Sequence, residues 1–382
     1  MHILVAQNAS RAKTGGASRV MGFIHEEIEK VGHVVDYLCA DDVPTSMQGK
    51  FARFTFPLLV RRRALAAGRV GNPYDIITVH EPSAAAVVTA RRALGHVPIV
   101  VMSYGLERRR WRLDLSYLQR NGARVGIKKR IASPLTTLWQ AEIGLRLADH
   151  VLCSNSEDQD FICRIIGRSP NAVTRVFSGA TSVYAAPATK RWRVYNGRIL
   201  FAGSWIERKG IRELASAFTT LANRHPELTL IVLGSGEEES VIRNAFPESI
   251  RQRVFSRQAS NDTEASAFYA SADIFVLPSR FEGTPLTLIE AMASALPVVT
   301  TAICGMRDVI RHGENGLLVR PLSSDALVEA VERLRGDPGL REYLGRAASK
   351  DAREKYTWDR IAQPVLQVYE RLCTGRKNKV DA

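Results

Sequence analysis

The chain has 382 residues, of which 45% are hydrophobic and 24% are charged, so its composition is that of a globular protein of about two domains. The formal net charge is +14, and most of the excess lies in residues 1–187, which hold 25 basic and 15 acidic residues against 28 and 24 in the remainder. No apolar run approaches the ~20 residues of a membrane-spanning helix, and the five scattered cysteines lack metal-ligand spacing, which favours a cytoplasmic protein with reduced cysteines and no zinc site.

The first predicted elements form a Rossmann-like opening. A strand over His2–Gln7 is followed at once by a polar loop, which is not typical of a signal peptide. The loop holds Gly15 and Gly16 and leads into a helix over Ser18–Val31, and Val34–Leu38 predicts a second strand. The loop lacks the G-x-G-x-x-G pattern, and a plain tight turn is sufficient to explain its two glycines.

Two basic segments with interleaved apolar residues follow. Lys50–Arg69 has six basic residues and no acid, and Glu107–Arg130 has nine basic residues and two acids. Lys50–Arg69 is either a partly buried helix pair interrupted at Pro57, with a solvated basic edge, or an interfacial segment that binds an anionic membrane surface. We do not expect nucleic acid as a partner, because no helix-turn-helix, zinc-finger or RNA-recognition signature is present.

The other strands of the first half end in polar residues, which is where open α/β sheets place their sites. Asp75–His80 predicts a strand, and the simplest interpretation of His80 is a structural role. Pro98–Met102 predicts the next strand, and Tyr104 follows it. The remaining predicted elements are a helix over Leu135–Ala148, strands over Val151–Cys153 and Val173–Phe177, and an interdomain linker at Ala185–Gly197.

The second half begins with another strand, loop and helix. A strand over Ile199–Ala202 leads into the loop Gly203–Gly210, and a helix then runs to about Asn223. Turn residues end the next two strands, with Gly234 and Gly236 after Leu228–Leu233, and Arg257 after Val254-Phe255. Further on, the pattern predicts a surface helix over Asp325–Leu334 and a closing helix over Trp358–Leu372.

A βαβ unit over Asp273–Thr301 is the most informative stretch. Strands are predicted at Ile274–Leu277 and Val298–Thr301, with a helix over Leu286–Ala295 between them. Thr284 before Pro285 predicts a hydroxyl cap followed by proline at the first helical position. A helix start offers free N–H groups to a phosphate, and two carboxylates flank this one, Glu282 before it and Glu290 in the second turn. Taken alone, Glu282 is more simply explained as a solvated side chain, and Glu290 as an ordinary helix glutamate.

The segment E-G-T-P-L-T-L-I-E, from Glu282 to Glu290, resembles the E-x7-E signature of retaining glycosyltransferases with the two-Rossmann GT-B architecture, in glycosyltransferase family 4. The resemblance covers most of the chain and is specific in residues 199–320. It implies an α/β fold of two Rossmann-like domains facing a cleft, over 1–187 with the closing helix 358–382, and over 188–357. It also implies a nucleotide-sugar donor, a glycan or lipid-linked acceptor in polysaccharide or glycolipid assembly, and no metal or other cofactor.

The resemblance further implies roles for individual residues. Glu290 is expected to hold the ribose hydroxyls, Glu282 to lie at the donor sugar, and Lys209 to grip the pyrophosphate. Arg208 stands beside Lys209 and compensates in part for the family's missing arginine only if it points the same way as Lys209. Tyr104 stands where many relatives carry a histidine that contacts the sugar. The other residues expected at the donor are Gly283, Thr284, Pro285, Leu286, Thr287, Ser204, Gly234, Gly236, Arg257, Gly15 and Gly16.

Two departures from the family pattern leave other functions open. Ser204 occupies the usual position of a phosphate-binding arginine, for which a hydroxyl is no simple replacement, and Tyr104 replaces the histidine. A nucleotide-sugar epimerase on the same fold, or a non-catalytic relative that binds nucleotide-sugar, therefore also fits. Turnover of donor without acceptor distinguishes the epimerase, and binding without turnover distinguishes the non-catalytic relative.

Overall fold

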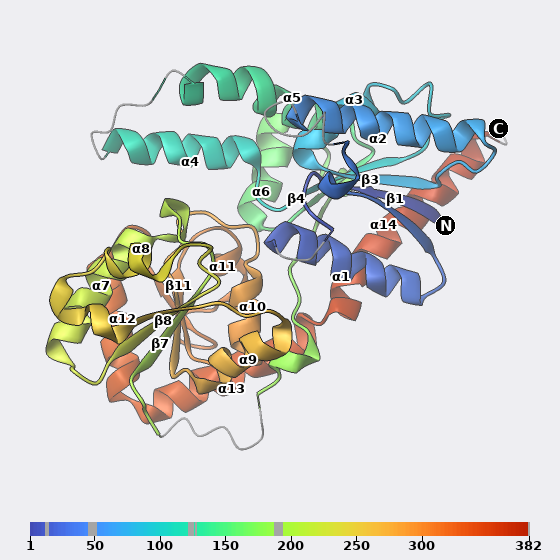
Figure 1. Cartoon of the computed structure of the whole chain (residues 1–382). Helices are drawn as coiled ribbons and strands as arrows, with labels where there is room; N and C mark the ends of the chain where they lie inside the picture. Colours follow the sequence, from blue (N-terminus) through green and yellow to red (C-terminus); the bar gives the residue numbers. More distant parts are fainter. Residues whose placement is uncertain (12–14, 45–51, 121–125, 127, 187–193, 381–382) are drawn as a thin grey trace. The chain divides into compact units, whose positions relative to one another are not determined.

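The computed structural model describes residues 1–11, 15–44, 52–120, 126, 128–186 and 194–380. Contacts divide the chain into two units (Figure 1), the first made of Met1–Phe177 and Trp358–Ala382 and the second of Ser178–Thr357. The change of unit thus falls between Phe177 and Ser178. The predicted boundary at residue 187 and part of the predicted linker, residues 187–193, lie outside the described residues.

The first unit contains a parallel six-stranded sheet in the order β2-β1-β3-β4-β5-β6. Ile3 of β1 pairs with Val35 of β2 on one side and with Ile76 of β3 on the other. The central strands are buried on both faces, which agrees with their continuous apolar runs. The strands are β1 (His2–Ala6), β2 (Val34–Leu38), β3 (Ile76–His80), β4 (Ile99–Ser103), β5 (His150–Cys153) and β6 (Val173–Arg175).

Helices connect these strands, and one of them corrects a prediction. The predicted break at Pro57 is wrong, because α2 (Ala52–Arg69) runs as one helix through this buried proline. Residues 45–51, 121–125 and 127, which include parts of both basic segments, lie outside the described residues. Apart from α14 (Trp358–Val380), the other α- and π-helices are α1 (Gly16–Lys30), α3 (Ala85–Val88), α4 (Glu107–Arg120), η5 (Lys128–Ala132), η6 (Pro134–Leu138), α5 (Trp139–Leu147), α6 (Ser156–Phe161) and η7 (Ile162–Ile166).

The helix α14 (Trp358–Val380) completes the first unit, as the predicted closing helix requires. The Trp358 ring stacks on Phe23 of α1 at a centroid distance of 4.9 Å. The Tyr369 hydroxyl forms hydrogen bonds with His25 Nε2 at 2.9 Å and with Thr78 Oγ1 at 2.6 Å. Helix α14 therefore supplies a polar partner to two buried side chains of α1 and β3.

The second unit contains another parallel six-stranded sheet, in the order β12-β11-β10-β7-β8-β9. The strand order reverses between β7 and β10, which pair through Phe275 and Leu200. The loops after these two strands leave the same edge of the sheet at this switch point, where ligands bind in open α/β folds. The strands are β7 (Arg198–Ala202), β8 (Thr229–Leu233), β9 (Val254–Arg257), β10 (Ile274–Leu277), β11 (Val298–Thr301) and β12 (Leu317–Val319).

The helix that carries Glu290, α10 (Leu286–Ala293), begins at the first residue of the predicted range, but Pro285 is not its first helical residue as predicted. Pro285 has an extended backbone (φ −66°, ψ 126°) and is itself the N-cap, so the predicted hydroxyl cap at Thr284 is wrong. The helix ends before Ala295, whose φ of 52° is left-handed. The other α-helices are α7 (Ile211–Arg224), α8 (Glu239–Arg243), α9 (Asp262–Ser271), α11 (Cys304–Val309), α12 (Ser324–Gly336) and α13 (Pro338–Lys355), of which α8, α11 and α13 were not predicted.

In the described part of the chain, no helix combines the length and the apolar character needed to cross a membrane.

Candidate active site

Two loops of the second unit form the candidate site, the loop after β7 with Arg208 and the loop after β10 with Phe281. The Arg208 carbonyl oxygen accepts a hydrogen bond from the backbone N–H of Arg280 at 2.8 Å. The Arg208 Nη1 in turn donates to the carbonyl oxygen of Phe281 at 2.7 Å. The two backbones also meet at Gly210, where φ is +73° and a Cβ would lie 2.0 Å from the Pro278 carbonyl oxygen. Only glycine permits this approach.

The Glu282 carboxylate lies between two cations. Its Oε1 is 2.7 Å from Lys209 Nζ and 2.9 Å from Arg208 Nη1. Burial alone would raise the pKa of Glu282, but the charges of Lys209 and Arg208 outweigh it and hold this pKa below its usual value. Arg208 and Lys209 therefore point to the same carboxylate oxygen, although they are neighbours in sequence. The solvated state that remained open for Glu282 is excluded, since only 7% of this residue is exposed.

The second glutamate, Glu290, is buried and contacts Tyr269 of α9. Its Oε2 accepts a hydrogen bond from the Tyr269 hydroxyl at 2.9 Å, and only 3% of Glu290 is exposed. The Tyr269 ring contacts the Tyr184 ring edge-on, with centroids 5.4 Å apart. The interpretation of Glu290 as an ordinary solvated helix residue is therefore wrong. No feature of the sequence singles out Tyr269, because its spacing in α9 is that of any core aromatic.

Two side-chain hydroxyls donate hydrogen bonds to the backbone of the loop after β10. The Ser178 hydroxyl donates to the Thr284 carbonyl oxygen at 2.6 Å, and the Thr301 hydroxyl donates to the Ser279 carbonyl oxygen. Gly305 touches the same loop, because a Cβ there would lie 1.8 Å from the Gly283 carbonyl oxygen. These supports were not predicted as functional residues. Only the position of Ser178 just after a predicted strand gave any signal for them.

The first turn of α10 faces no side-chain cap within the described residues. Its first N–H groups, at Leu286 and Thr287, have no partner inside the helix, as at any helix start. The Thr287 Oγ1 is buried and has no hydrogen-bond partner among the described residues. Free N–H groups, the positive end of the helix dipole and a buried hydroxyl together suit an anion.

The remaining predicted residues of the second unit lie at the carboxyl ends of neighbouring strands. Ser204 is exposed in the loop after β7, and the backbone N–H of the next residue, Trp205, donates to the Ser235 carbonyl oxygen at 2.8 Å. Gly234 and Gly236 flank that serine with φ of 66° and 74°, a conformation that favours glycine. Arg257 ends β9 and lies 3.7 Å from the Glu239 carboxylate.

Three predicted residues belong to the first unit. The Tyr104 hydroxyl follows β4 and donates to Met102 Sδ at 3.1 Å, while the Tyr104 ring lies 5.5 Å from the ring of His80. Gly15 is the N-cap of α1, with φ of −106°, and a Cβ on Gly16 would meet nothing within 4 Å. The fold itself therefore does not require glycine at either position. Roles for these three residues at a donor stay predictions.

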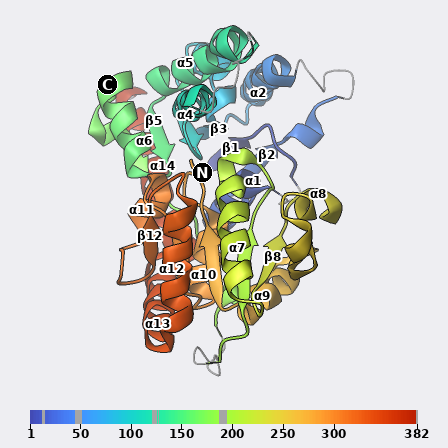
Figure 2. The ribbon, with the colours of Figure 1, turned by 90° about the vertical axis from the view of Figure 1, so that its left-hand side faces the viewer.

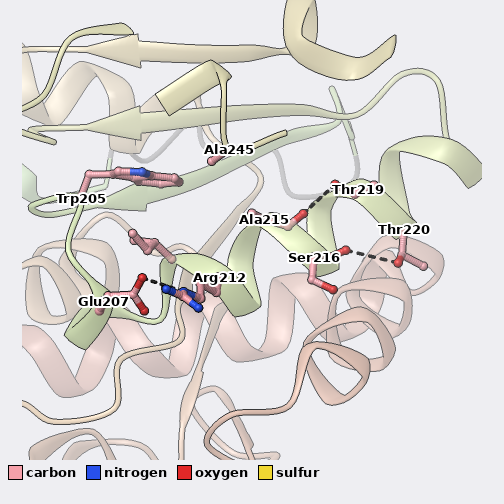
Figure 3. A pocket seen from close by; sticks show the side chains of 9 residues that line it. Trp205, Glu207, Arg212, Ala215, Ser216, Thr219, Thr220 and Ala245 are labelled. Carbon is pink, nitrogen blue, oxygen red and sulfur yellow. Dashed lines mark hydrogen bonds and ion pairs between the residues drawn. The ribbon is translucent and has the colours of Figure 1, made fainter. Parts of the chain in front are cut away.

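A groove of about 610 Å³ lies next to the loop after β7 (Figure 3). It is lined by Trp205 and Glu207 from that loop and by residues of α7, among them Arg212. In Figure 3 the Glu207 carboxylate points toward Arg212, whose Nε lies 2.7 Å from Glu207 Oε1. The groove is distinct from the cluster around Glu282, since neither Glu282 nor Glu290 lines it. No group of three or more His, Cys, Asp or Glu side chains among the described residues has the arrangement of a metal site.

Two doubly wound parallel sheets, the second with its site at the switch point, define the GT-B class of fold. The sucrose-phosphate synthase of Thermosynechococcus elongatus has this fold with a TM-score of 0.77 and 20% sequence identity, over 98% of this chain and 99% of that chain. Residues 190–351 match the family model described as "Glycosyl transferases group 1". The match to the family model lies within the second unit, and the resemblance stated from the sequence is confirmed there.

Two curated relatives cover different shares of the chain. The chain is 28% identical to a phosphatidyl-myo-inositol mannosyltransferase of Mycobacterium leprae, over 98% of this chain and 93% of that protein. It is 35% identical to an uncharacterized glycosyltransferase of Methanocaldococcus jannaschii, over 45% of this chain. The second alignment spans 44% of the length of the Methanocaldococcus protein.

Proposed function

We propose that the chain is a retaining, metal-independent glycosyltransferase that moves a sugar from a nucleotide-sugar to a glycan or lipid-linked acceptor. The observation that carries this proposal is the contact of Lys209 and Arg208 with the single carboxylate of Glu282, at 2.7 and 2.9 Å. Two cations and one carboxylate leave one net positive charge. Together with the uncapped first turn of α10, this charge suits a diphosphate.

The proposed reaction needs no second carboxylate as nucleophile. The bond between the anomeric carbon and the phosphate oxygen breaks, and the acceptor oxygen bonds to that carbon on the same face. The leaving phosphate oxygen takes the proton of the acceptor hydroxyl, in contrast to retaining hydrolases and their paired carboxylates. Lys209 and Arg208 stabilise the charge that grows on the diphosphate, so their effect is largest in the transition state.

The two glutamates would bind the two ends of the donor. Glu282 would contact hydroxyls of the transferred sugar, with its charge kept by the neighbouring cations. Glu290 would accept hydrogen bonds from the ribose hydroxyls through its carboxylate, which Tyr269 orients by a hydrogen bond of 2.9 Å. A sugar phosphate has no ribose and would leave the buried Glu290 carboxylate without its two hydroxyl partners. Glu290 would therefore favour a nucleotide over a sugar phosphate.

A panel of UDP-, GDP- and ADP-sugars tests this function. One member should raise the apparent unfolding temperature, because ligand present at about 100 times its Kd stabilises the folded state by about 2.7 kcal/mol. The same donor should then be consumed only with an acceptor, and the product should keep the anomeric configuration. Turnover without acceptor would instead identify an epimerase, and binding without any turnover a non-catalytic relative.

A surface of the first unit favours a lipid-linked acceptor. We define the apolar–arginine surface as the exposed side of α2, α4, η5, η6 and the start of α5. Arg53 of α2 reaches Thr136 of η6 at 3.4 Å, and α4 also contacts η6, so these elements adjoin one another (Figure 2). The large apolar residues exposed there are Phe54, Leu58, Leu113, Ile131, Leu135 and Trp139.

Arginines accompany these apolar residues. Arg61 and Arg62 of α2 are exposed, whereas Arg63 donates to the Tyr74 hydroxyl at 3.2 Å and pairs with Asp36 at 3.3 Å. A surface that combines cations with exposed apolar side chains suits an anionic bilayer, with about 1 kcal/mol for each basic residue near the headgroups. The Mycobacterium leprae relative, whose name specifies phosphatidyl-myo-inositol, supports an acceptor of this kind.

Liposome sedimentation tests whether the apolar–arginine surface binds lipid. Binding should increase with the fraction of anionic lipid, decline as salt increases, and fall in a variant with Arg61→Ser, Arg62→Ser and Leu135→Ser. Arg63 is left unchanged because it stabilises the fold. The control is Arg346→Ser on α13, where an exposed arginine is also lost. If the protein does not sediment with anionic vesicles at low salt, the acceptor is better sought among soluble glycans.

A further inference from the structure

Arg280 lies in the loop after β10, two residues before Glu282, and its backbone and side chain have different partners. The backbone N–H donates to the Arg208 carbonyl oxygen, as described above. The guanidinium instead reaches the first turn of α7, where its Nη2 lies 3.0 and 2.9 Å from the two carboxylate oxygens of Glu213. One residue thus contacts both the loop after β7 and the helix that follows that loop.

The pair of Arg280 and Glu213 is sheltered from water. The side chains are 11% and 14% exposed, unlike the surface ion pairs of the chain. Exposed pairs contribute little to stability, but the loss of one partner of a sheltered pair leaves a charge without compensation. A second carboxylate, Glu207, also lies 3.4 Å from Arg280 Nη1, and it is the same carboxylate that points to Arg212 in Figure 3. Arg280 is therefore fixed from two sides.

These contacts join the two backbone segments that form the candidate site. Glu213 stands four residues after Lys209, and Arg280 stands two residues before Glu282. The ion pair of Arg280 with Glu213 therefore connects the two backbone segments that carry Lys209 and Glu282, whose charged atoms meet at 2.7 Å. The close approach of Gly210 to the Pro278 carbonyl oxygen prevents the same segments from moving closer.

We propose that Arg280 is a positioning residue that sets the separation of Lys209 from Glu282. The close approach at Gly210 sets the minimum separation of Lys209 from Glu282. The ion pair of Arg280 with Glu213 sets the maximum separation. The expected effect on catalysis rests on the proposed function. Groups that stabilise a departing diphosphate act only when they are held within a fraction of an ångström of the productive geometry. Arg280 itself touches no substrate in this proposal.

The first test measures geometry without any substrate. Wild-type Lys209 should react slowly with N-hydroxysuccinimidyl acetate, measured by mass spectrometry relative to the exposed Lys350, because its amine is paired and largely buried. Arg280→Ala should raise the relative rate at Lys209 at least tenfold, and Arg280→Lys, which keeps the charge but loses the two-oxygen contact, should give an intermediate rate. The matched control Arg346→Ala, which breaks an exposed arginine pair with Glu342, should leave the Lys209 rate unchanged.

The second test measures turnover. With the donor found in the nucleotide-sugar panel, Arg280→Ala should lower kcat at least tenfold while the KM for the donor changes less than threefold. The charge exchange Arg280→Glu with Glu213→Arg should recover part of kcat and restore slow acylation of Lys209. A purely structural role predicts a lower unfolding temperature with unchanged Lys209 reactivity and unchanged kcat in the folded enzyme, and that result would overturn the proposal.

The two tests separate this inference from the proposed function. If no nucleotide-sugar is turned over by the wild-type chain, the proposed function fails, while the acylation rates still decide whether Arg280 positions Lys209. If Arg280→Ala does not fold, Arg280→Lys and Glu213→Gln supply the same comparison. Unchanged Lys209 reactivity in either folded variant contradicts the positioning role.

Discussion

Replacing Glu282 with glutamine removes the charge shared by Lys209 and Arg208 while keeping the size of the side chain. At 2.7 Å and an effective dielectric constant of about 20, the gross attraction of one such contact is about 6 kcal/mol. Most of it is offset by desolvation, and loss of one partner from a fully buried pair costs about 3–5 kcal/mol. Because the Arg208 side chain is 28% exposed and partly solvated, we expect a loss of about 2–3 kcal/mol in the free energy of unfolding.

The same substitution should strengthen the binding of a nucleoside diphosphate. In the wild type the phosphates compete with Glu282 for two cations, whereas in Glu282→Gln both cations are available. We expect about tenfold tighter binding, which is about 1.4 kcal/mol, together with a large loss of sugar transfer. Urea unfolding and calorimetric titration with UDP, GDP and ADP measure the two effects. The control Glu342→Gln removes an exposed carboxylate of α13 and should change stability by less than about 0.5 kcal/mol.

The pH dependence gives an independent check of the same contact. Although burial opposes it, the charges of Lys209 and Arg208 keep the pKa of Glu282 below its usual value in the folded state. The stabilising contribution is therefore complete above the unfolded pKa, near 4.5, and is lost as pH falls through the folded pKa. Wild type and Glu282→Gln should converge in stability in that acidic range. Weaker diphosphate binding by Glu282→Gln, as in Lys209→Ala, would refute the reasoning.

Three further predictions concern other contacts. Glu290→Gln should weaken binding of the preferred nucleotide by about 1–3 kcal/mol in calorimetry, and unchanged affinity would remove Glu290 from the site. Lys209→Ala should reduce kcat much more than stability, and Arg208→Ala should do the same if Arg208 takes over the role of the missing arginine; unchanged kinetics in Arg208→Ala would exclude that substitution of roles. Burial lowers the pKa of His25 to about 4, so the unfolded state binds the extra proton first, and stability should fall between about pH 6.5 and 4 by up to about 3 kcal/mol. Equilibrium unfolding of His25→Gln should lack this slope, and an equal slope in both proteins would contradict the assignment.

The order of elements could be predicted because it depends on local periodicity. Val298–Thr301 was recognised as a strand from its apolar run alone, and it is one. The sequence predicts Pro285 as the first helical residue, but it is the N-cap of α10, because proline fits both the first helical position and an extended N-cap. Pro57 was expected to interrupt a helix, yet burial in the core keeps α2 continuous around it. Both errors arise where tertiary packing decides between two local states.

The candidate site was predictable only in part, for a different reason. Glu282 and Glu290 belong to a motif with fixed spacing, so their positions could be inferred from a resemblance. The contacts of Arg280 with Glu213 and of Ser178 with Thr284 join residues that are 67 and 106 positions apart. No periodicity or motif links such pairs. Their meeting depends on the strand order of the second sheet, which places β10 next to β7.

The return of α14 to the first unit affects the order in which a growing chain can fold. Tyr369, the hydrogen-bond partner of His25 and Thr78, lies on α14. The whole of Ser178–Thr357 separates α14 from Phe177 in the sequence. At about 5–20 residues per second, a ribosome needs roughly 9–36 s to synthesise this insert. At the end of that interval the second unit is complete, whereas the first unit still lacks a helix that covers its core. The second unit can thus finish folding before the first, so the synthesis of α14 sets the time at which the earliest part of the chain becomes native.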